Sequence, residues 1–173
     1  MTRLLLLVVI TSFFISCKPS NEELISRKWV AVAIDNPELT PERIAETRYF
    51  FDTVGKSTSP EVNEQLYGVR NMDSLREILK YQLEGELATQ EAIVQHTWMD
   101  FHKDGRVAAN FGTEKADTVN WYFEEGNLFL DEMKYKGSGS KIKMEVLKLD
   151  KETLQIRFNE NGFTSTATFK PAE

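Results

Sequence analysis

From residue 96 to the C-terminus, apolar and polar residues alternate with a period of two, and turn residues interrupt the alternation at regular intervals. This pattern is typical of antiparallel β-strands, because successive side chains of a strand point to opposite faces of its sheet. An earlier β-branched run begins at Trp29, ends at Ile34 and predicts one more strand. The later predicted strands cover residues 96–103, 106–112, 118–124, 127–131, 141–149, 153–159 and 163–170.

The predicted strands have one apolar face and one face rich in threonine and charge. One buried face and one wet face favour an antiparallel sheet curled around its own core. Eight hairpin-linked strands can close into an up-and-down barrel, which has no exposed edges. The fold class predicted is therefore mainly β with a helical insertion, an eight-stranded antiparallel up-and-down barrel, with a β-sandwich as the alternative. The apolar face comprises Val107, Ala109, Phe111, Val119, Trp121, Phe123, Leu128, Leu130, Ile142, Met144, Val146, Leu154, Ile156, Phe158, Phe163, Ala167 and Phe169.

Asp104-Gly105 is the strongest hairpin signal in the chain, because both residues can adopt positive φ. Further turns are predicted at residues 125–126, 150–151 and 161–162. They separate 118–124 from 127–131, 141–149 from 153–159, and 153–159 from 163–170.

Residues 38–95 have helical rather than strand periodicity. Thr40 and Ser59 each precede a proline, which is a good helix start because the first helical position needs no N–H donor. Ser74 and a glutamate three residues later form a capping box ahead of a helix over 75–92. The narrow apolar stripe of this helix favours packing on the rest of the domain over binding a partner.

The N-terminus has the pattern of a secretory signal peptide. Arg3 is followed by an apolar run over residues 4–15, broken only by Thr11 and Ser12. A membrane-spanning helix needs about 20 apolar residues, so this run is too short to span a bilayer. We therefore expect residues 1–16 to be cleaved.

Cys17 is the only cysteine, and it lies where the predicted signal peptide ends. The segment 14–17 resembles the lipobox of bacterial lipoproteins, with phenylalanine in place of the usual leucine, and this implies acylation of Cys17. An ordinary signal peptide with an incidental cysteine is the alternative. We expect residues 17–21 to form a lipidated tether and residues 22–173 a single domain, which a short helix with a capping box at Ser20 begins.

Composition and motifs exclude several kinds of function. The formal net charge of −6 and the lack of a Lys and Arg cluster argue against nucleic acid as a partner. The common hydrolase, zinc and nucleotide-binding motifs do not occur, so the sequence predicts no enzyme, catalytic residue, cofactor or metal site. His96, Trp98, Asp100 and His102 are predicted to share one strand face, with the two histidines about 20 Å apart and too distant to bind one metal.

The segment Arg27-Lys28-Trp29 at the start of the first strand, after a short helix, resembles a lipocalin-like domain of bacterial lipoproteins. The resemblance covers residues 21–34 and 96–170, where hairpin-linked strands return the last strand beside the first. Arg27 stands at the position where lipocalins usually have glycine. The helical segment 38–95 stands in place of the loop that follows the first strand of lipocalins and lies at the open mouth of their barrel. The resemblance implies a small apolar ligand inside the barrel, with the helical segment acting as a lid or as a support layer.

Five bulky apolar residues are the predicted ligand-binding lining of the barrel, although such bulk can also fill an eight-stranded barrel completely. The predicted function is that of a membrane-anchored lipoprotein of the cell envelope, in the outer membrane, that binds a small apolar molecule. The alternative is a structural or protein-interaction lipoprotein with a solid barrel core and an envelope protein as partner. The five residues are Phe111, Trp121, Phe123, Met144 and Phe158.

Overall fold

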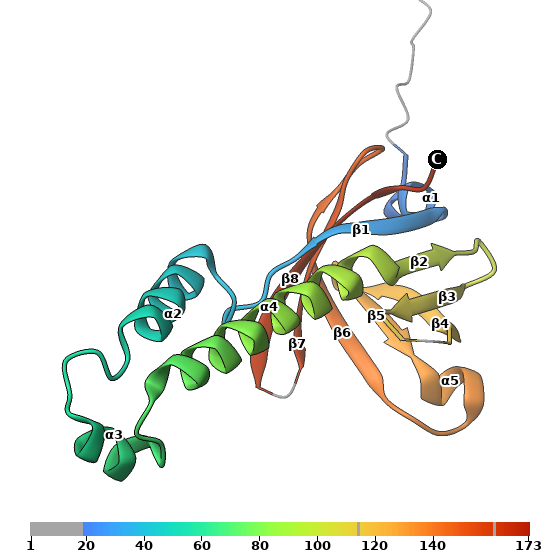
Figure 1. Ribbon diagram of the computed structural model, residues 1–173. Helices are drawn as coiled ribbons and strands as arrows, with labels where there is room; N and C mark the ends of the chain where they lie inside the picture. Colours follow the sequence, from blue (N-terminus) through green and yellow to red (C-terminus); the bar gives the residue numbers. More distant parts are fainter. Residues whose placement is uncertain (1–18, 114, 161) are drawn as a thin grey trace, which may run out of the picture.

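Eight antiparallel strands form one closed barrel in the computed structural model, which describes residues 19–113, 115–160 and 162–173 (Figure 1). Each strand pairs with the next in sequence, and β1 closes the barrel against β8 through pairs that include Trp29 with Pro171. The predicted up-and-down barrel is confirmed. The strands are β1 Lys28–Ile34, β2 Thr97–Phe101, β3 Arg106–Phe111, β4 Asp117–Glu124, β5 Asn127–Asp131, β6 Lys141–Leu149, β7 Leu154–Glu160 and β8 Phe163–Pro171.

The described hairpin turns lie at the predicted positions but differ from the prediction in detail, and Asn161 of the last predicted turn lies outside the described residues. Glu125 and Gly126 both have positive φ, of 50° and 78°, and form the two-residue turn between β4 and β5. At the predicted turn between β2 and β3, only Gly105 has positive φ. The amide of His102 donates to the Arg106 carbonyl at 2.8 Å, so three residues form this loop and the glycine ends it.

Most side chains of the predicted apolar face lie inside the barrel, whereas Phe111 and Ile142 are exposed and the side chain of Phe163 lies outside the described part of the chain. Trp29, Met99, Val107, Leu128 and Leu154 are fully buried there. Trp29 also lies against α1, where its indole N–H donates to the Ile25 carbonyl at 2.9 Å. The core therefore extends to the end of the barrel beside α1, which we call the closed end.

The described residues form five helices, three of which lie in the predicted insertion. Thr40 and Ser59 cap α2 and α3 as the sequence predicts. The long helix α4 starts earlier than the predicted 75–92, because Asn71 caps it by accepting from the Asp73 amide at 2.9 Å. It also ends later, where its last turns pack on β1 and β3. The helices are α1 Asn21–Ile25, α2 Pro41–Thr53, α3 Pro60–Tyr67, α4 Met72–His96 and α5 Glu132–Lys136.

The extension of α4 corrects two predictions about the following strand. The predicted strand over 96–103 is β2, which is shorter, so His96 ends α4 and His102 follows the strand. These two histidines therefore do not share a strand face with Trp98 and Asp100. The short helix α5 was not predicted, although Asp131 caps it and Gly137 ends it at a φ of 77°.

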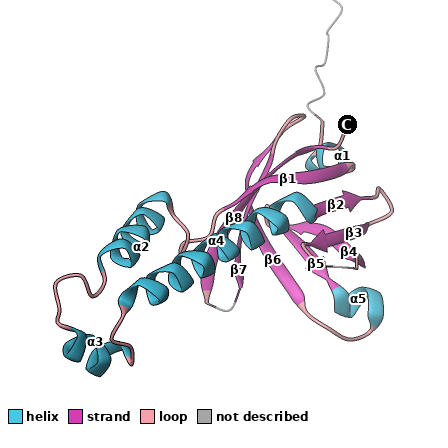
Figure 2. Ribbon diagram, in the orientation of Figure 1, coloured by secondary structure: helices cyan, strands magenta, loops and turns pink. Residues whose placement is uncertain are grey.

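Helices α2, α3 and α4 form an arm that projects from the barrel (Figures 1 and 2). We call residues 41–96 the helical arm. Its α2 packs beside α4, α3 lies at the tip, and the last turns of α4 contact β1 and β3. Val54, Met72 and Leu83 are buried inside the arm, each 5% exposed or less. The arm thus has a small apolar core of its own and joins the barrel through α4.

Candidate binding cavity at the barrel mouth

A cavity of about 290 Å³ opens at the end of the barrel opposite α1, which we call the mouth. In an up-and-down barrel, the ends of odd strands and the beginnings of even strands meet at one end. Side chains from β1, β2, β3, β6 and β7 therefore converge there with one residue of α4. The lining consists of Ile34, Ile93, Thr97, Phe111, Ile142, Met144, Phe158 and Asn159.

The cavity has a buried floor and an exposed apolar rim. Met144 is 2% exposed and belongs to the barrel core, whereas Phe111 and Ile142 on the rim are 45% and 37% exposed. Below Met144 the interior is filled by packed side chains, including Met99, Leu128 and Ile156. The packed core thus ends below Met144, and the mouth cavity lies above it.

The last turns of α4 form one wall of the cavity, and specific contacts hold them there. The Thr97 hydroxyl donates to the Ile93 carbonyl at 2.7 Å, and the Gln90 amide donates to the Ile34 carbonyl at 3.1 Å. A Cβ on Gly112 would lie 3.0 Å from the Ile93 Cα, so only glycine lets the chain after β3 approach the helix so closely. Ile93 is thereby held at the mouth.

None of the eight lining residues is charged, and six are apolar. The ionisable groups whose pKa clearly departs from its ordinary value lie on the outer surface of the described chain. Lys136, for example, holds the pKa of Asp117 below its usual value through a hydrogen bond. The site therefore suits a neutral, mostly apolar ligand, with Asn159 and Thr97 as its polar groups.

A second, more open hollow of about 480 Å³ lies beside α1 at the closed end. Trp121 and Phe123 line it together with charged groups such as Glu22 and Lys103. Trp121 is fixed in place, since its indole N–H donates to the His102 carbonyl at 3.0 Å and its ring packs edge-on against Phe123. This hollow has charged side chains at its rim, unlike the mouth cavity.

The structure divides the five predicted lining residues between the two ends of the barrel. Phe111, Met144 and Phe158 come together in the mouth cavity, and Trp121 and Phe123 lie at the closed end. Alternation shows that a residue faces inward, but it carries no information about which end of the barrel is hollow.

Five further residues of the cavity were not in the predicted lining. Ile34 and Ile142 lie on predicted strands but were not assigned to the ligand site. Ile93 lies on the helix α4, and Thr97 and Asn159 are polar residues that an apolar pattern does not select. The hydrogen bond between Thr97 and the carbonyl of Ile93 could not be anticipated while residue 96 was assigned to a strand.

No family of known proteins matches this chain. Comparisons with curated proteins and with solved structures found no match either. The cavity and its chemistry are therefore the basis for a functional proposal.

Two further properties of the described residues bear on the site. Among the described residues, which are 19–113, 115–160 and 162–173, no group of three or more His, Cys, Asp or Glu side chains is placed to hold a metal ion. Within the same part of the chain, no helix is long and apolar enough to cross a membrane. Cys17, the predicted acylation site, lies outside the described residues.

Proposed function

We propose that this chain is a membrane-tethered, lipocalin-like binding protein, not an enzyme, that holds a small apolar molecule in the mouth cavity. The observation that carries the proposal is the uncharged, mostly apolar cavity of about 290 Å³ at the end of a packed barrel core. This volume lies just below the range of about 300 to 1,000 Å³ that is usual for ligand sites. It equals about ten water molecules of liquid, so a ligand with roughly ten non-hydrogen atoms would fit.

Membrane attachment in this proposal depends on acylation of Cys17 in the envelope of a bacterium, at its outer membrane. Several acyl chains would make attachment effectively permanent. The described chain begins beside α1, at the closed end of the barrel (Figure 1). An anchor there would leave the mouth and the helical arm facing away from the membrane, so that the ligand can enter freely.

The helical arm is better described as a support than as a lid. Of the described residues that line the cavity, Ile93 alone comes from the helical arm, and α2 and α3 contribute none. We propose that α4 holds one wall of the cavity open while the other arm helices stay clear of the mouth.

Decan-1-ol, with 11 non-hydrogen atoms, is a suitable probe for this cavity. We expect it to shift the methyl NMR signals of Ile93, Ile142 and Met144 in the chain from residue 17 onward, made with Cys17→Ser so that no acyl chain is attached. Saturation of the shifts gives the dissociation constant.

Two variants on β6 separate cavity binding from general surface binding. Ile142→Trp fills the mouth, and we expect it to weaken decanol binding by roughly tenfold or more. Leu147→Trp is the matched control, because Leu147 lies on the same strand, is 36% exposed compared with 37% for Ile142, and does not line the cavity. Equal decanol binding by both variants, or unchanged Met144 signals in the parent chain, would contradict the proposal.

A further inference from the structure

Helix α4 has an exposed apolar face opposite the face that packs on α2. Leu83 points into the arm and is 5% exposed, whereas Ile78 and Tyr81 are 54% and 82% exposed. Gly85, Ala88 and Ala92 continue the exposed face toward the barrel. Because these five residues are three and four positions apart, they form one line along the helix, which we call the outer seam.

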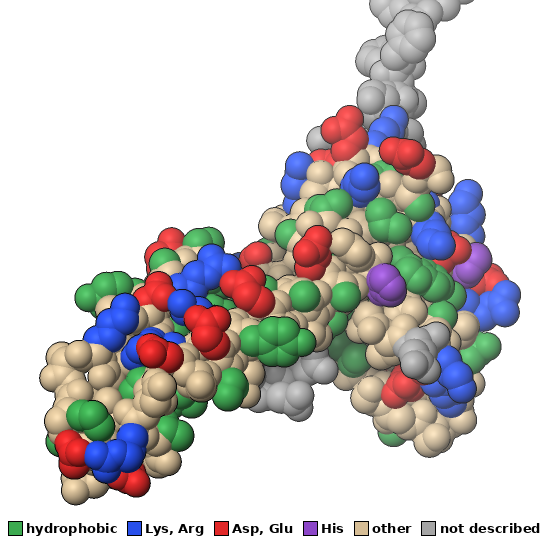
Figure 3. Space-filling view, in the orientation of Figure 1, with side chains coloured by type: hydrophobic (Ala, Val, Ile, Leu, Met, Phe, Trp, Pro, Cys, Tyr) green, Lys and Arg blue, Asp and Glu red, His purple; other side chains and the backbone are tan. Residues whose placement is uncertain are grey.

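A row of glutamates borders one side of the outer seam. Glu77, Glu84 and Glu91 are all exposed and are seven residues apart, so they lie above one another on the helix. Figure 3 shows carboxylates on the arm, interspersed with Lys and Arg side chains and with apolar side chains. The other side of the seam carries Gln82 and Thr89, with no basic residue.

Part of this negative charge has no counterion within the arm. Arg48 on α2 bonds Glu84 at 2.9 Å, and Lys80 lies 3.9 Å from Glu77. Glu91 makes no ion pair with the described residues and accepts instead from the Gln95 amide at 3.1 Å. Residues 38–95 as a whole contain 11 acidic and 6 basic side chains. The surface beside the seam is therefore acidic.

The outer seam has the dimensions and chemistry of one side of a short coiled coil. From Ile78 to Ala92 it extends for about 21 Å at 1.5 Å per residue. Small residues in its centre let another helix approach closely, while Ile78 and Tyr81 supply the large apolar contacts. In such pairs, charged residues beside the seam select the partner.

Charge decides among the possible occupants of the seam. If two copies of α4 packed antiparallel along their seams, the glutamate row of one copy would face the glutamate row of the other. If they packed parallel, each glutamate row would face Gln82, Thr89 and His96 of the other copy. Neither arrangement makes ion pairs. An anionic lipid surface would repel the same row. We propose that the outer seam docks a helix of a partner protein that has an apolar stripe flanked by Lys or Arg.

Two labelled peptides of 21 residues test this proposal. Both have leucine along one helical stripe, and lysine flanks it in one peptide and glutamate in the other. Fluorescence anisotropy with the Cys17→Ser chain from residue 17 should show saturable binding of the lysine peptide only. We expect Tyr81→Ser to weaken this binding roughly fivefold or more, and the control Tyr49→Ser to leave it unchanged. Tyr49 is the matched residue because it is 71% exposed on α2.

A charge reversal tests the selectivity directly. Glu77→Lys with Glu91→Lys should weaken binding of the lysine peptide and allow the glutamate peptide to bind. Glu42→Lys with Glu46→Lys makes the same change of net charge on α2, and it should leave the preference for the lysine peptide unchanged. Circular dichroism checks that all variants fold.

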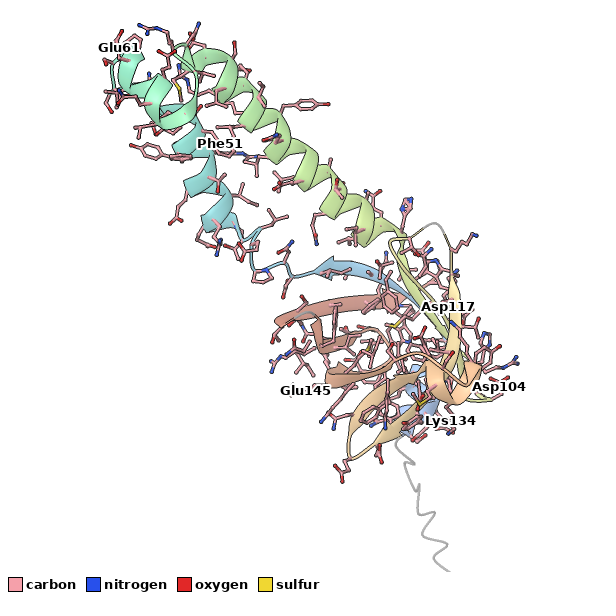
Figure 4. All side chains as sticks on the ribbon, turned by 90° about the horizontal axis from the view of Figure 1, so that it is seen from below. Phe51, Glu61, Asp104, Asp117, Lys134 and Glu145 are labelled. Carbon is pink, nitrogen blue, oxygen red and sulfur yellow. The ribbon has the colours of Figure 1, made fainter. Side chains whose placement is uncertain are left out.

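Figure 4 shows that α2, which carries Phe51, lies beside α4, and that Glu61 lies at the tip of the arm.

Four results would overturn the proposal. The first is that binding of the lysine peptide does not saturate below about 1 mM. The second is that the charge reversal on α2 changes the preference between the two peptides in the same way as the charge reversal on α4. The third is a dimer of the chain in sedimentation that Tyr81→Ser abolishes, which would assign the seam to a second copy. The fourth is binding of phosphatidylglycerol vesicles that Tyr81→Ser abolishes, which would assign it to a lipid surface. Decanol binding at the mouth is independent of all four results.

Discussion

Replacement of Trp29 by phenylalanine tests whether α1 and this side chain close the barrel. Trp29 is fully buried, and its indole N–H donates to the Ile25 carbonyl at 2.9 Å. Its ring also carries the Arg27 guanidinium at 5.6 Å from the centroid. Phenylalanine keeps most of the apolar contact but loses the hydrogen bond and part of the ring.

The cost of Trp29→Phe can be estimated from these contacts. Loss of the hydrogen bond costs about 1 kcal/mol of unfolding free energy, and the smaller ring leaves a gap that costs about 1 to 2 kcal/mol more. The expected destabilisation is therefore roughly 2 to 3 kcal/mol. Trp29→Ala should cost about 3 to 5 kcal/mol, as is typical for a buried tryptophan.

Urea unfolding followed by circular dichroism measures this destabilisation. With a slope of about 2 kcal/mol/M, Trp29→Phe should lower the midpoint by roughly 1 to 1.5 M. Trp98→Phe is the control, because Trp98 is half-buried on the outer face of β2 with the Lys28 ammonium 4.4 Å from its ring centroid. We expect it to cost less than about 1 kcal/mol.

The reasoning would be refuted if Trp98→Phe lowered the midpoint as much as Trp29→Phe. Decanol binding gives a second check, because the mouth cavity lies at the opposite end of the barrel from Trp29. Folded Trp29→Phe protein should bind decanol with an unchanged dissociation constant.

Three further predictions concern the anchor, the approach of α4 and one surface ion pair. Labelled palmitate should be incorporated into the membrane-bound chain in bacteria, and Cys17→Ser should abolish both labelling and membrane sedimentation. In urea unfolding, Gly112→Ala should lower the free energy of unfolding by about 1 to 2 kcal/mol more than Gly126→Ala does. Both residues have positive φ, of 74° and 78°, but only at Gly112 would the new Cβ meet α4, because Gly126 faces open space. Lys136 lowers the pKa of Asp117 from its usual 3.8, so an NMR titration should show this pKa rising toward 3.8 in Lys136→Met. The lowered pKa stabilises the fold above pH 3.8, and this small contribution disappears as the pH falls through the folded-state pKa.

Much of the architecture could be predicted from local patterns. Alternation places Val107, Leu128 and Ile156 inside the barrel, because a strand presents every second side chain to one face. The starts of α2 and α3 follow from Thr40 and Ser59, since a cap and a proline act within a few residues. Such features depend on near neighbours in the chain, so the sequence alone specifies them.

The position of the cavity could not be predicted in this way. Phe111 and Trp121 look equivalent in the strand pattern, yet Phe111 lines the mouth and Trp121 the closed end. Which end stays hollow depends on how large side chains from all eight strands pack together and on where Ile93 of α4 approaches the barrel. The same holds for α4, whose last turn continues to His96 because it packs on β1 and β3. These features arise from contacts between residues far apart in sequence, and only the folded chain brings those residues together.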